Sequence, residues 1–320
     1  NQARAVFGRL INAEQDAIAV IPATSYGMAV AAANLDLGAD QNIVVVEDQF
    51  PSNYYIWVEK AAAAGAVMNV VPRPDNGDWT PGVLAAIGPD TAIVTLPPCH
   101  WMDGSLLDLE KIGVRCREVG AAYVIDGTQA IGAQPMDIAK IQPDFLACSA
   151  YKWLLSPYTL AFLYAAPHRR AGRPLELHSG NHDPGQLQGT YSTALRPNAA
   201  RYDMGERTNL TLLPMACVAM EQLLDWGIDG IEAYLGSLTD RIADEAGRRG
   251  YSHPPREHRA RHFIGLTPPG GVPEGLVDKL AAENVYVAPR GPCIRVSPHM
   301  HNDFEDIERL FDALDRHLPA

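Results

Sequence analysis

The chain has 320 residues, of which 47% are hydrophobic and 20% charged, proportions typical of a globular protein with one large or two ordinary domains. The 26 Lys and Arg residues against 38 Asp and Glu residues give a formal net charge of −12. Nucleic acid and anionic membrane surfaces require clustered basic side chains, so we expect neither as a partner. No apolar run reaches the ~18 residues that a transmembrane helix needs.

The five cysteines lie far apart and form no C-x-x-C pair, which indicates reduced thiols and a cytoplasmic location. The chain starts at Asn1 with a helical pattern, and we expect no signal peptide there. Whether a further segment precedes Asn1 is left open.

Helical and strand patterns alternate through the first two thirds of the chain. Helices are expected at 3–13, 24–38, 54–65, 81–88 and 108–120. Strands are expected at 17–22, 42–48, 67–73, 91–98, 122–127, 145–150 and 161–167. Apolar strands that alternate with helices predict an α/β fold with a mostly parallel sheet flanked by helices.

The segment 176–201 is polar and rich in Gly, Pro and Asn, which predicts a long loop. Two helical patterns follow it, at 213–227 and 228–250. The remaining chain predicts a small α+β unit with strands at 262–267, 285–289 and 293–298 and helices at 273–283 and 303–318. We therefore expect a large domain over 1–227 and a small C-terminal domain over 228–320.

Two strand ends carry polar residues that suit a ligand site. Asp126 ends one apolar strand, Gln129 follows three residues later, and Lys152 comes just after the next strand. The carboxyl ends of parallel strands meet at one edge of the sheet, where ligands bind. An acid and a lysine there can also form a purely structural ion pair, and position alone does not decide between the two.

The glycine-rich fingerprints of nucleotide-binding loops are absent. The candidate for an anion site is "PATSYG", where Thr24 and Ser25 lie between a strand and an alanine-rich helix. A simple helix N-cap explains the same pattern, and spacing alone favours the cap.

Five segments in order resemble one enzyme family: "TSYG", "LPPCHWMDG", "DGTQAIGAQPMDI…PDFLACSAYKW", "RYDMGERTN" and "GPCIRVSPHMHND". They are similar to fold-type I pyridoxal-phosphate (PLP) enzymes, and within these to the class V branch. That branch includes class V aminotransferases, cysteine desulfurases, isopenicillin N epimerase-like enzymes and kynureninases. The resemblance implies a large PLP-binding domain with a seven-stranded sheet. It also implies a homodimer with active sites near the interface, to which "GERTN" contributes.

The resemblance assigns a role to each matching residue. Lys152 would form the Schiff base with PLP and act as the base at the substrate Cα, and Asp126 would pair with the pyridine nitrogen. Gln129 would bond the ring's 3-oxygen, and Arg295 would bind the substrate carboxylate. The implied phosphate ligands are Thr24, Ser25, Ser149 and Tyr151. Trp101 is the implied stacking residue over the ring, with His100 as the alternative and as a candidate substrate contact.

Three departures from the family pattern bear on function. The turn after the lysine reads "SPYTLAF" in place of G-P-x-G-x-G, so we expect Tyr158 to contact the substrate. Glu206 stands where many members have a threonine that reaches the partner's phosphate, and a carboxylate is a poor ligand there. A desulfurase needs a mobile nucleophilic cysteine before the arginine, whereas Cys293 lies on an expected strand.

His258 and His262 have helical spacing, but no acidic ligand set accompanies them, so no metal is expected. The sequence predicts a PLP-dependent enzyme acting on a small amino acid, with aminotransferase chemistry preferred. Alternatives are β-elimination or C–S lyase chemistry, desulfuration, epimerisation and kynureninase-like hydrolysis. Two further hypotheses are a catalytically silent dimeric relative and a Schiff-base lysine enzyme without PLP.

Overall fold

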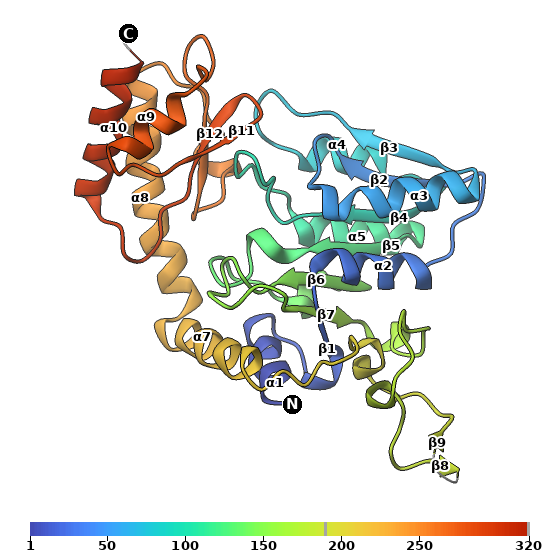
Figure 1. Cartoon of the computed structure of the whole chain (residues 1–320). Helices are drawn as coiled ribbons and strands as arrows, with labels where there is room; N and C mark the ends of the chain where they lie inside the picture. Colours follow the sequence, from blue (N-terminus) through green and yellow to red (C-terminus); the bar gives the residue numbers. More distant parts are fainter. Residues whose placement is uncertain (189–190, 319–320) are drawn as a thin grey trace. The chain divides into compact units, whose positions relative to one another are not determined.

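The computed structural model describes residues 1–188 and 191–318 (Figure 1). The chain forms two compact units. The larger comprises Asn1–Arg73, Thr80–Pro98 and Asp108–Trp226, and the smaller comprises Pro74–Trp79, Cys99–Leu107 and Gly227–Ala320. The division into domains at residue 227 stays a proposal, and the smaller compact unit also takes in a pair of short segments from earlier in the chain.

The larger unit alternates strands and helices. Its strands are β1 (Ile18–Ile21), β2 (Asn42–Val46), β3 (Val67–Val71), β4 (Thr91–Leu96), β5 (Ala122–Asp126), β6 (Phe145–Ser149), β7 (Ala161–Ala165), β8 (Leu187–Gln188) and β9 (Tyr191–Ser192). Its α-helices are α1 (Gln2–Leu10), α2 (Thr24–Asn34), α3 (Tyr55–Ala64), α4 (Thr80–Ala86), α5 (Leu109–Val119), α6 (Ile138–Ile141) and α7 (Leu212–Trp226).

Seven of these strands form one sheet, in the order β1-β7-β6-β5-β4-β2-β3 (Figure 1). The strands from β6 to β3 run parallel to one another, whereas β7 is antiparallel to both β6 and β1. The prediction of an α/β fold with a mostly parallel sheet is confirmed. Because β4, β5 and β6 are parallel, their carboxyl ends lie at one edge of the sheet.

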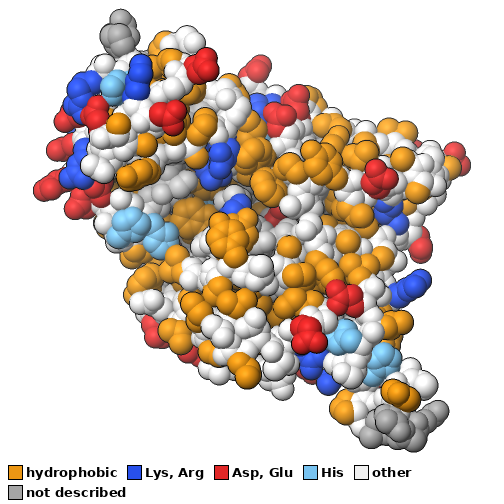
Figure 2. All heavy atoms as spheres, viewed as in Figure 1, with side chains coloured by type: hydrophobic (Ala, Val, Ile, Leu, Met, Phe, Trp, Pro, Cys, Tyr) orange, Lys and Arg blue, Asp and Glu red, His pale blue; other side chains and the backbone are white. Residues whose placement is uncertain are grey.

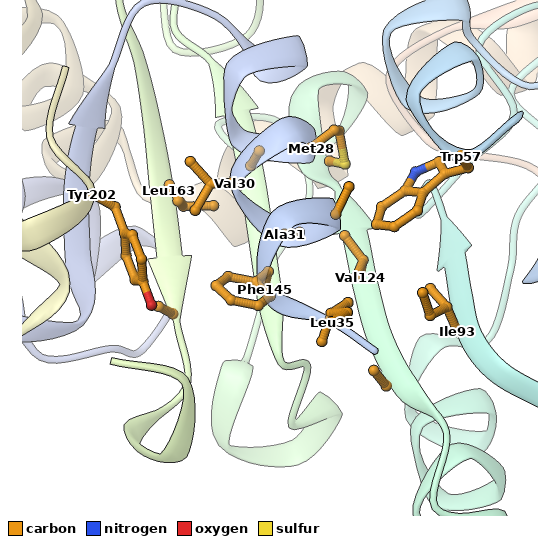
Figure 3. Packing of buried hydrophobic residues seen from close by; sticks show 14 of the residues in the cluster. Met28, Val30, Ala31, Leu35, Trp57, Ile93, Val124, Phe145, Leu163 and Tyr202 are labelled. Carbon is orange, nitrogen blue, oxygen red and sulfur yellow. The ribbon is translucent and has the colours of Figure 1, made fainter. Parts of the chain in front are cut away.

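Helix α2 packs its apolar residues onto this sheet (Figure 3). Met28, Val30 and Ala31 are completely buried, and the cluster continues through Trp57 of α3 and Phe145 of β6. A Cβ atom at Gly27 would lie 2.7 Å from the Ala147 Cβ, so only glycine permits this approach of α2 to β6. The approach brings the first turn of α2 next to the end of β6.

The smaller unit is an α+β arrangement. It contains α8 (Ile228–Arg248), β10 (Ile264–Leu266), α9 (Leu276–Ala282), β11 (Ala288–Arg290), β12 (Cys293–Val296) and α10 (Phe304–His317). The three strands form an antiparallel sheet in the order β10-β12-β11, and α8 packs against α10. Across the described ranges of both units, no helix is long and apolar enough to cross a membrane.

A buried ion-pair network joins α1, β1 and the chain after β9. The Asp203 side chain is completely buried and accepts a 2.6 Å hydrogen bond from Arg4 Nη2. Arg207 Nε lies 3.1 Å from the same carboxylate, and the Val20 amide donates to its other oxygen at 2.9 Å. Three donors around one buried carboxylate compensate for its lost hydration.

We expect Asp203→Ala to lower the free energy of unfolding by about 3 kcal/mol, because it leaves two guanidinium groups without their carboxylate. Urea denaturation followed by tryptophan fluorescence measures the change. The control is Glu118→Ala, which removes an exposed pair with Arg115 and is expected to cost under about 0.5 kcal/mol. Equal losses in the two variants would contradict this account of the network.

Candidate active site

Lys152 lies in the turn between β6 and β7 and is half-buried. Its ammonium nitrogen Nζ is 5.0 Å from the ring centre of Phe50 and 5.7 Å from that of Tyr151. Phe50 belongs to the loop that follows β2. Aromatic faces attract a cation, so both rings stabilise the ammonium group at this sheet edge.

Asp126 is the last residue of β5, and only 5% of it is exposed. Its carboxylate accepts a hydrogen bond of 3.1 Å from the Thr128 amide. Burial raises the pKa of Asp126, while the hydrogen bonds from Thr128 and the charge of Lys152 act in the opposite direction. A carboxylate so placed is suited to hold a protonated nitrogen of a ligand.

Three hydroxyl groups meet where α2 begins. The Thr24 hydroxyl oxygen lies 2.8 Å from the hydroxyl oxygens of both Thr128 and Ser149. Ser149 Oγ also accepts from the Thr24 amide at 3.3 Å, and Thr128 Oγ1 accepts from the Ser149 amide at 3.2 Å. Hydroxyl groups beside the amides of a helix N-terminus form a suitable site for an anion such as phosphate.

The simple N-cap explanation of Thr24 does not hold in the structure. Ala23 occupies the N-cap position of α2, and it makes no side-chain capping bond. Thr24 is the first helical residue, and its hydroxyl bonds to residues more than a hundred positions away in the chain. Ser25, the next residue, is exposed.

The turn after β5 and the turn after β6 contact each other through side chains. Gln129, buried in the turn after β5, accepts a hydrogen bond of 3.3 Å from the indole nitrogen of Trp153. Trp153 directly follows Lys152 in the chain.

The segment after Lys152 projects an aromatic residue. The Tyr158 ring stacks on the Tyr151 ring at 4.1 Å, and Tyr158 remains 70% exposed. Thr159 has a φ of +63°, a left-handed conformation that costs energy for a β-branched residue and suits the glycine of the family turn. The backbone at Thr159 therefore has a conformation that glycine adopts more easily, although no glycine is present.

Arg295, Trp101 and His100 lie in the smaller unit. Arg295 Nη1 donates to the Trp101 carbonyl oxygen at 2.8 Å. Its buried Nε finds no hydrogen-bond acceptor among the residues that the structure describes. Burial and the charge of Arg290 lower the pKa of Arg295. A guanidinium group in these surroundings is suited to bind a ligand carboxylate.

His100 is completely buried, and its ring stacks on the Trp79 ring at 5.3 Å. The guanidinium carbon of Arg290 lies 5.6 Å from the Trp101 ring centre. The structure therefore gathers Thr24, Asp126, Gln129, Ser149, Tyr151 and Lys152 in the larger unit, and His100, Trp101 and Arg295 in the smaller.

The sequence analysis missed Thr128, Phe50 and Trp153. Thr128 could have been found, because it stands two residues after Asp126 in "DGTQ" and is a hydroxyl residue at a strand end. Nothing in the pattern around Phe50 marks it, since the loop after β2 reaches Lys152 only through the tertiary fold.

All five cysteines of the chain are buried. Cys293 donates through its sulfur to the Met102 and Arg290 carbonyl oxygens. Burial raises the pKa of Cys116 to about 12 and that of Cys148 well above its ordinary value. None of these thiols resembles the exposed nucleophile of a mobile loop.

A family model described as aminotransferase class-V matches residues 1–310. The chain belongs to the aminotransferase class-V family. Enzymes of this family depend on pyridoxal phosphate, so the protein is a PLP-dependent enzyme.

Two curated relatives of this class-V enzyme match nearly its whole length. The isopenicillin N epimerase of Streptomyces clavuligerus is 28% identical over 342 residues, which cover 98% of this chain and 83% of the relative. An uncharacterized aminotransferase, YcbU, of Bacillus subtilis is 23% identical over 323 residues, which cover 98% of this chain and 82% of the relative.

Among solved structures, the cysteine desulfurase CsdA from Escherichia coli superposes with a TM-score of 0.88 at 20% identity, covering 99% of this chain and 82% of that one. At that level of identity the likeness shows the fold.

The polar groups at this sheet edge of the larger unit fit PLP. The hydroxyl groups of Thr24, Thr128 and Ser149 at the start of α2 suit the phosphate, and the buried Asp126 carboxylate suits the ring nitrogen. The amine of Lys152 lies at the same sheet edge. A buried carboxylate with a raised pKa also explains why a cationic ligand group is favourable there.

In the cofactor-free protein, Asp126→Asn is expected to preserve or increase thermal stability at pH 8. Because the pKa of Asp126 is raised in the folded state, protonation stabilises the fold at low pH, and this stabilisation is lost as the pH rises through the raised pKa. The melting temperature of Asp126→Asn should therefore exceed that of the wild type by less at pH 5 than at pH 8.

The same variant should lose most of the stabilisation that added PLP gives the wild type. The control is Asp90→Asn, at an exposed turn. It should change neither the melting temperature of the cofactor-free protein nor the stabilisation by added PLP. A cofactor-free Asp126→Asn protein that melts lower than the wild type by equal amounts at both pH values would contradict this prediction.

Proposed function

We propose that the protein binds PLP covalently through Lys152 and transfers the amino group of a small amino acid. The observation that carries this proposal is the position of Lys152. Its amine lies at the sheet edge that also presents the buried Asp126 carboxylate and the hydroxyl groups at the start of α2. The class-V family match and the relative named an aminotransferase support amino transfer as the reaction.

When bound, PLP supplies an electron sink for the charge that develops at the substrate Cα. Asp126 holds a proton at the pyridine nitrogen, which increases that capacity. Thr24, Ser25 and Ser149, with the α2 amides, bind the phosphate. Lys152 removes and returns the proton at Cα, and the two aromatic rings beside it limit its hydration.

The smaller unit's residues take the remaining roles in this proposal. Arg295 binds the substrate carboxylate through its guanidinium group, whose buried Nε has no hydrogen-bond acceptor among the described residues. Trp101 stacks on the cofactor ring in this proposal, because His100 is completely buried and stacked on Trp79. Tyr158, exposed and held by its stack on Tyr151, contacts the substrate side chain.

Epimerisation at Cα is the second candidate, favoured by the relative named isopenicillin N epimerase, which matches 98% of this chain. The same residues serve both reactions, because each begins with proton removal at Cα by Lys152. Desulfuration is disfavoured in this chain, since all five of its cysteines are buried.

The purified protein is expected to take up PLP and turn yellow, and borohydride should attach the cofactor to Lys152, as peptide mass analysis would show. Lys152→Ala should abolish this attachment and lower turnover at least about a hundredfold, because it removes the general base. Lys140→Ala, an exposed lysine of α6, is the matched control and should behave as the wild type.

Product analysis separates the candidate reactions. Amino acids are incubated with the holoenzyme, with and without a keto-acid acceptor. Acceptor-dependent amino transfer supports the proposal. Inversion at Cα without an acceptor assigns the epimerase alternative, and loss of a side-chain fragment assigns lyase or hydrolase chemistry. A protein that takes up no PLP under any condition is a silent relative or a PLP-independent enzyme.

We also propose a homodimer, formed partly by an apolar stripe on α7. Met215, Val218 and Trp226 repeat at helical spacing and are 53%, 66% and 44% exposed, while α1 packs against α7 elsewhere. Leu210, just before the helix, is 85% exposed. Figure 2 shows hydrophobic side chains (orange) over the region where Figure 1 draws α7. Exposed apolar side chains gathered along one side of a helix are typical of an interface.

Val218→Asp is expected to weaken dimerisation at least tenfold, because it places a charge within the apolar stripe. Sedimentation equilibrium measures the dissociation constant. Val114→Asp on α5 introduces the same charge at a site that is 47% exposed, and should leave the dimer intact. A monomeric wild type, or a Val218→Asp dimer of unchanged affinity, would refute this interface.

A further inference from the structure

The turn after β5 and the turn after β6 are fixed to each other at two points. The first is the hydrogen bond from Trp153 Nε1 to Gln129 Oε1, with a length of 3.3 Å between two side chains that are at most 8% exposed. It joins the residue next to Lys152 to the residue three positions after Asp126.

The second point is a close backbone approach at Gly132, which has a φ of +105°. A Cβ atom there would lie 2.2 Å from the Trp153 carbonyl oxygen, so no side chain fits between the two turns. The position of Trp153, and with it that of the adjacent Lys152, is therefore coupled to the turn that carries Gln129.

The indole bond also decides how the Gln129 amide is oriented. An indole N–H only donates, whereas a glutamine amide has one end that accepts and one end that donates. The acceptor Oε1 must face Trp153, because the reverse orientation would oppose two donors. The donor Nε2 is consequently presented on the side of the amide away from Trp153.

We propose that Trp153 is a positioning residue, which orients the Gln129 amide so that its NH2 group, and not its oxygen, faces the cofactor's 3-oxygen. This inference rests on the proposed function and on the role that the family resemblance gives Gln129, a hydrogen bond to that oxygen. A donor there stabilises negative charge on the oxygen. The 3-oxygen shares a proton with the nitrogen derived from Lys152. Without the Gln129 donor the oxygen holds that proton more tightly, so the pKa of the proton rises.

The test is a pH titration of the visible absorption band of the holoenzyme. Gln129→Ala should move its midpoint upward by about one pH unit, the size expected for the loss of a hydrogen bond to a charged group. Trp153→Phe keeps an aromatic ring but removes the N–H, and should move the midpoint upward by about half a unit. The double variant should shift no further than Gln129→Ala alone.

Trp57→Phe is the matched control. It removes an indole N–H that donates to the Asn53 amide oxygen at 3.0 Å in the core of the same unit. Its melting temperature should fall about as much as that of Trp153→Phe, but its midpoint should stay at the wild-type value. An equal shift of the titration midpoint in Gln129→Ala, Trp153→Phe and Trp57→Phe would mean a general structural effect and would overturn the inference.

The remaining outcomes separate this inference from the proposed function. A Gln129→Ala shift without a Trp153→Phe shift removes the positioning role. If neither variant shifts while borohydride still attaches PLP to Lys152, the role of Gln129 is wrong and the proposed function stands. If the wild type binds no PLP, the proposed function fails, and the inference fails with it.

Discussion

The parallel pairing of β5 with β6 is the constraint on which the candidate site depends. It places the carboxylate of Asp126 and the turn of Lys152 at the same sheet edge, although 26 positions separate them in the chain. Gly27 adds the third component, since its missing side chain lets α2 approach β6 and bring its first turn to Ser149. A charged residue, a reactive amine and an anion site are thus fixed by backbone geometry.

Two buried carboxylates of the larger unit, those of Asp203 and Asp126, have different roles. Asp203 is surrounded by Arg4, Arg207 and a backbone amide, so its charge is compensated within the chain. The hydrogen bonds from Thr128 and the charge of Lys152 compensate the Asp126 charge incompletely, and burial raises its pKa. The first arrangement stabilises the fold, whereas the second leaves an interaction to be completed by a ligand.

The sheet was predictable from the sequence because its strands are continuous apolar runs separated by helices, a local pattern. Asp126 and Lys152 were identifiable for the same reason, as polar residues at the ends of such strands. Thr24 was less clear, since a capping threonine and a threonine bonded across the sheet look alike in sequence. Phe50 and the Trp153–Gln129 bond depend on tertiary approach, which no local period encodes. The grouping of Pro74–Trp79 and Cys99–Leu107 with the smaller unit is likewise a long-range property.

The burial of all five cysteines makes the natural chain suitable for site-specific labelling. Maleimides react with the thiolate, and buried thiols with raised pKa values form little of it. A single cysteine introduced in the exposed turn at Leu155 or Thr159 would therefore carry a fluorophore almost alone, without removal of the native residues. Such a probe would report on the surroundings of the segment beside Lys152 during turnover.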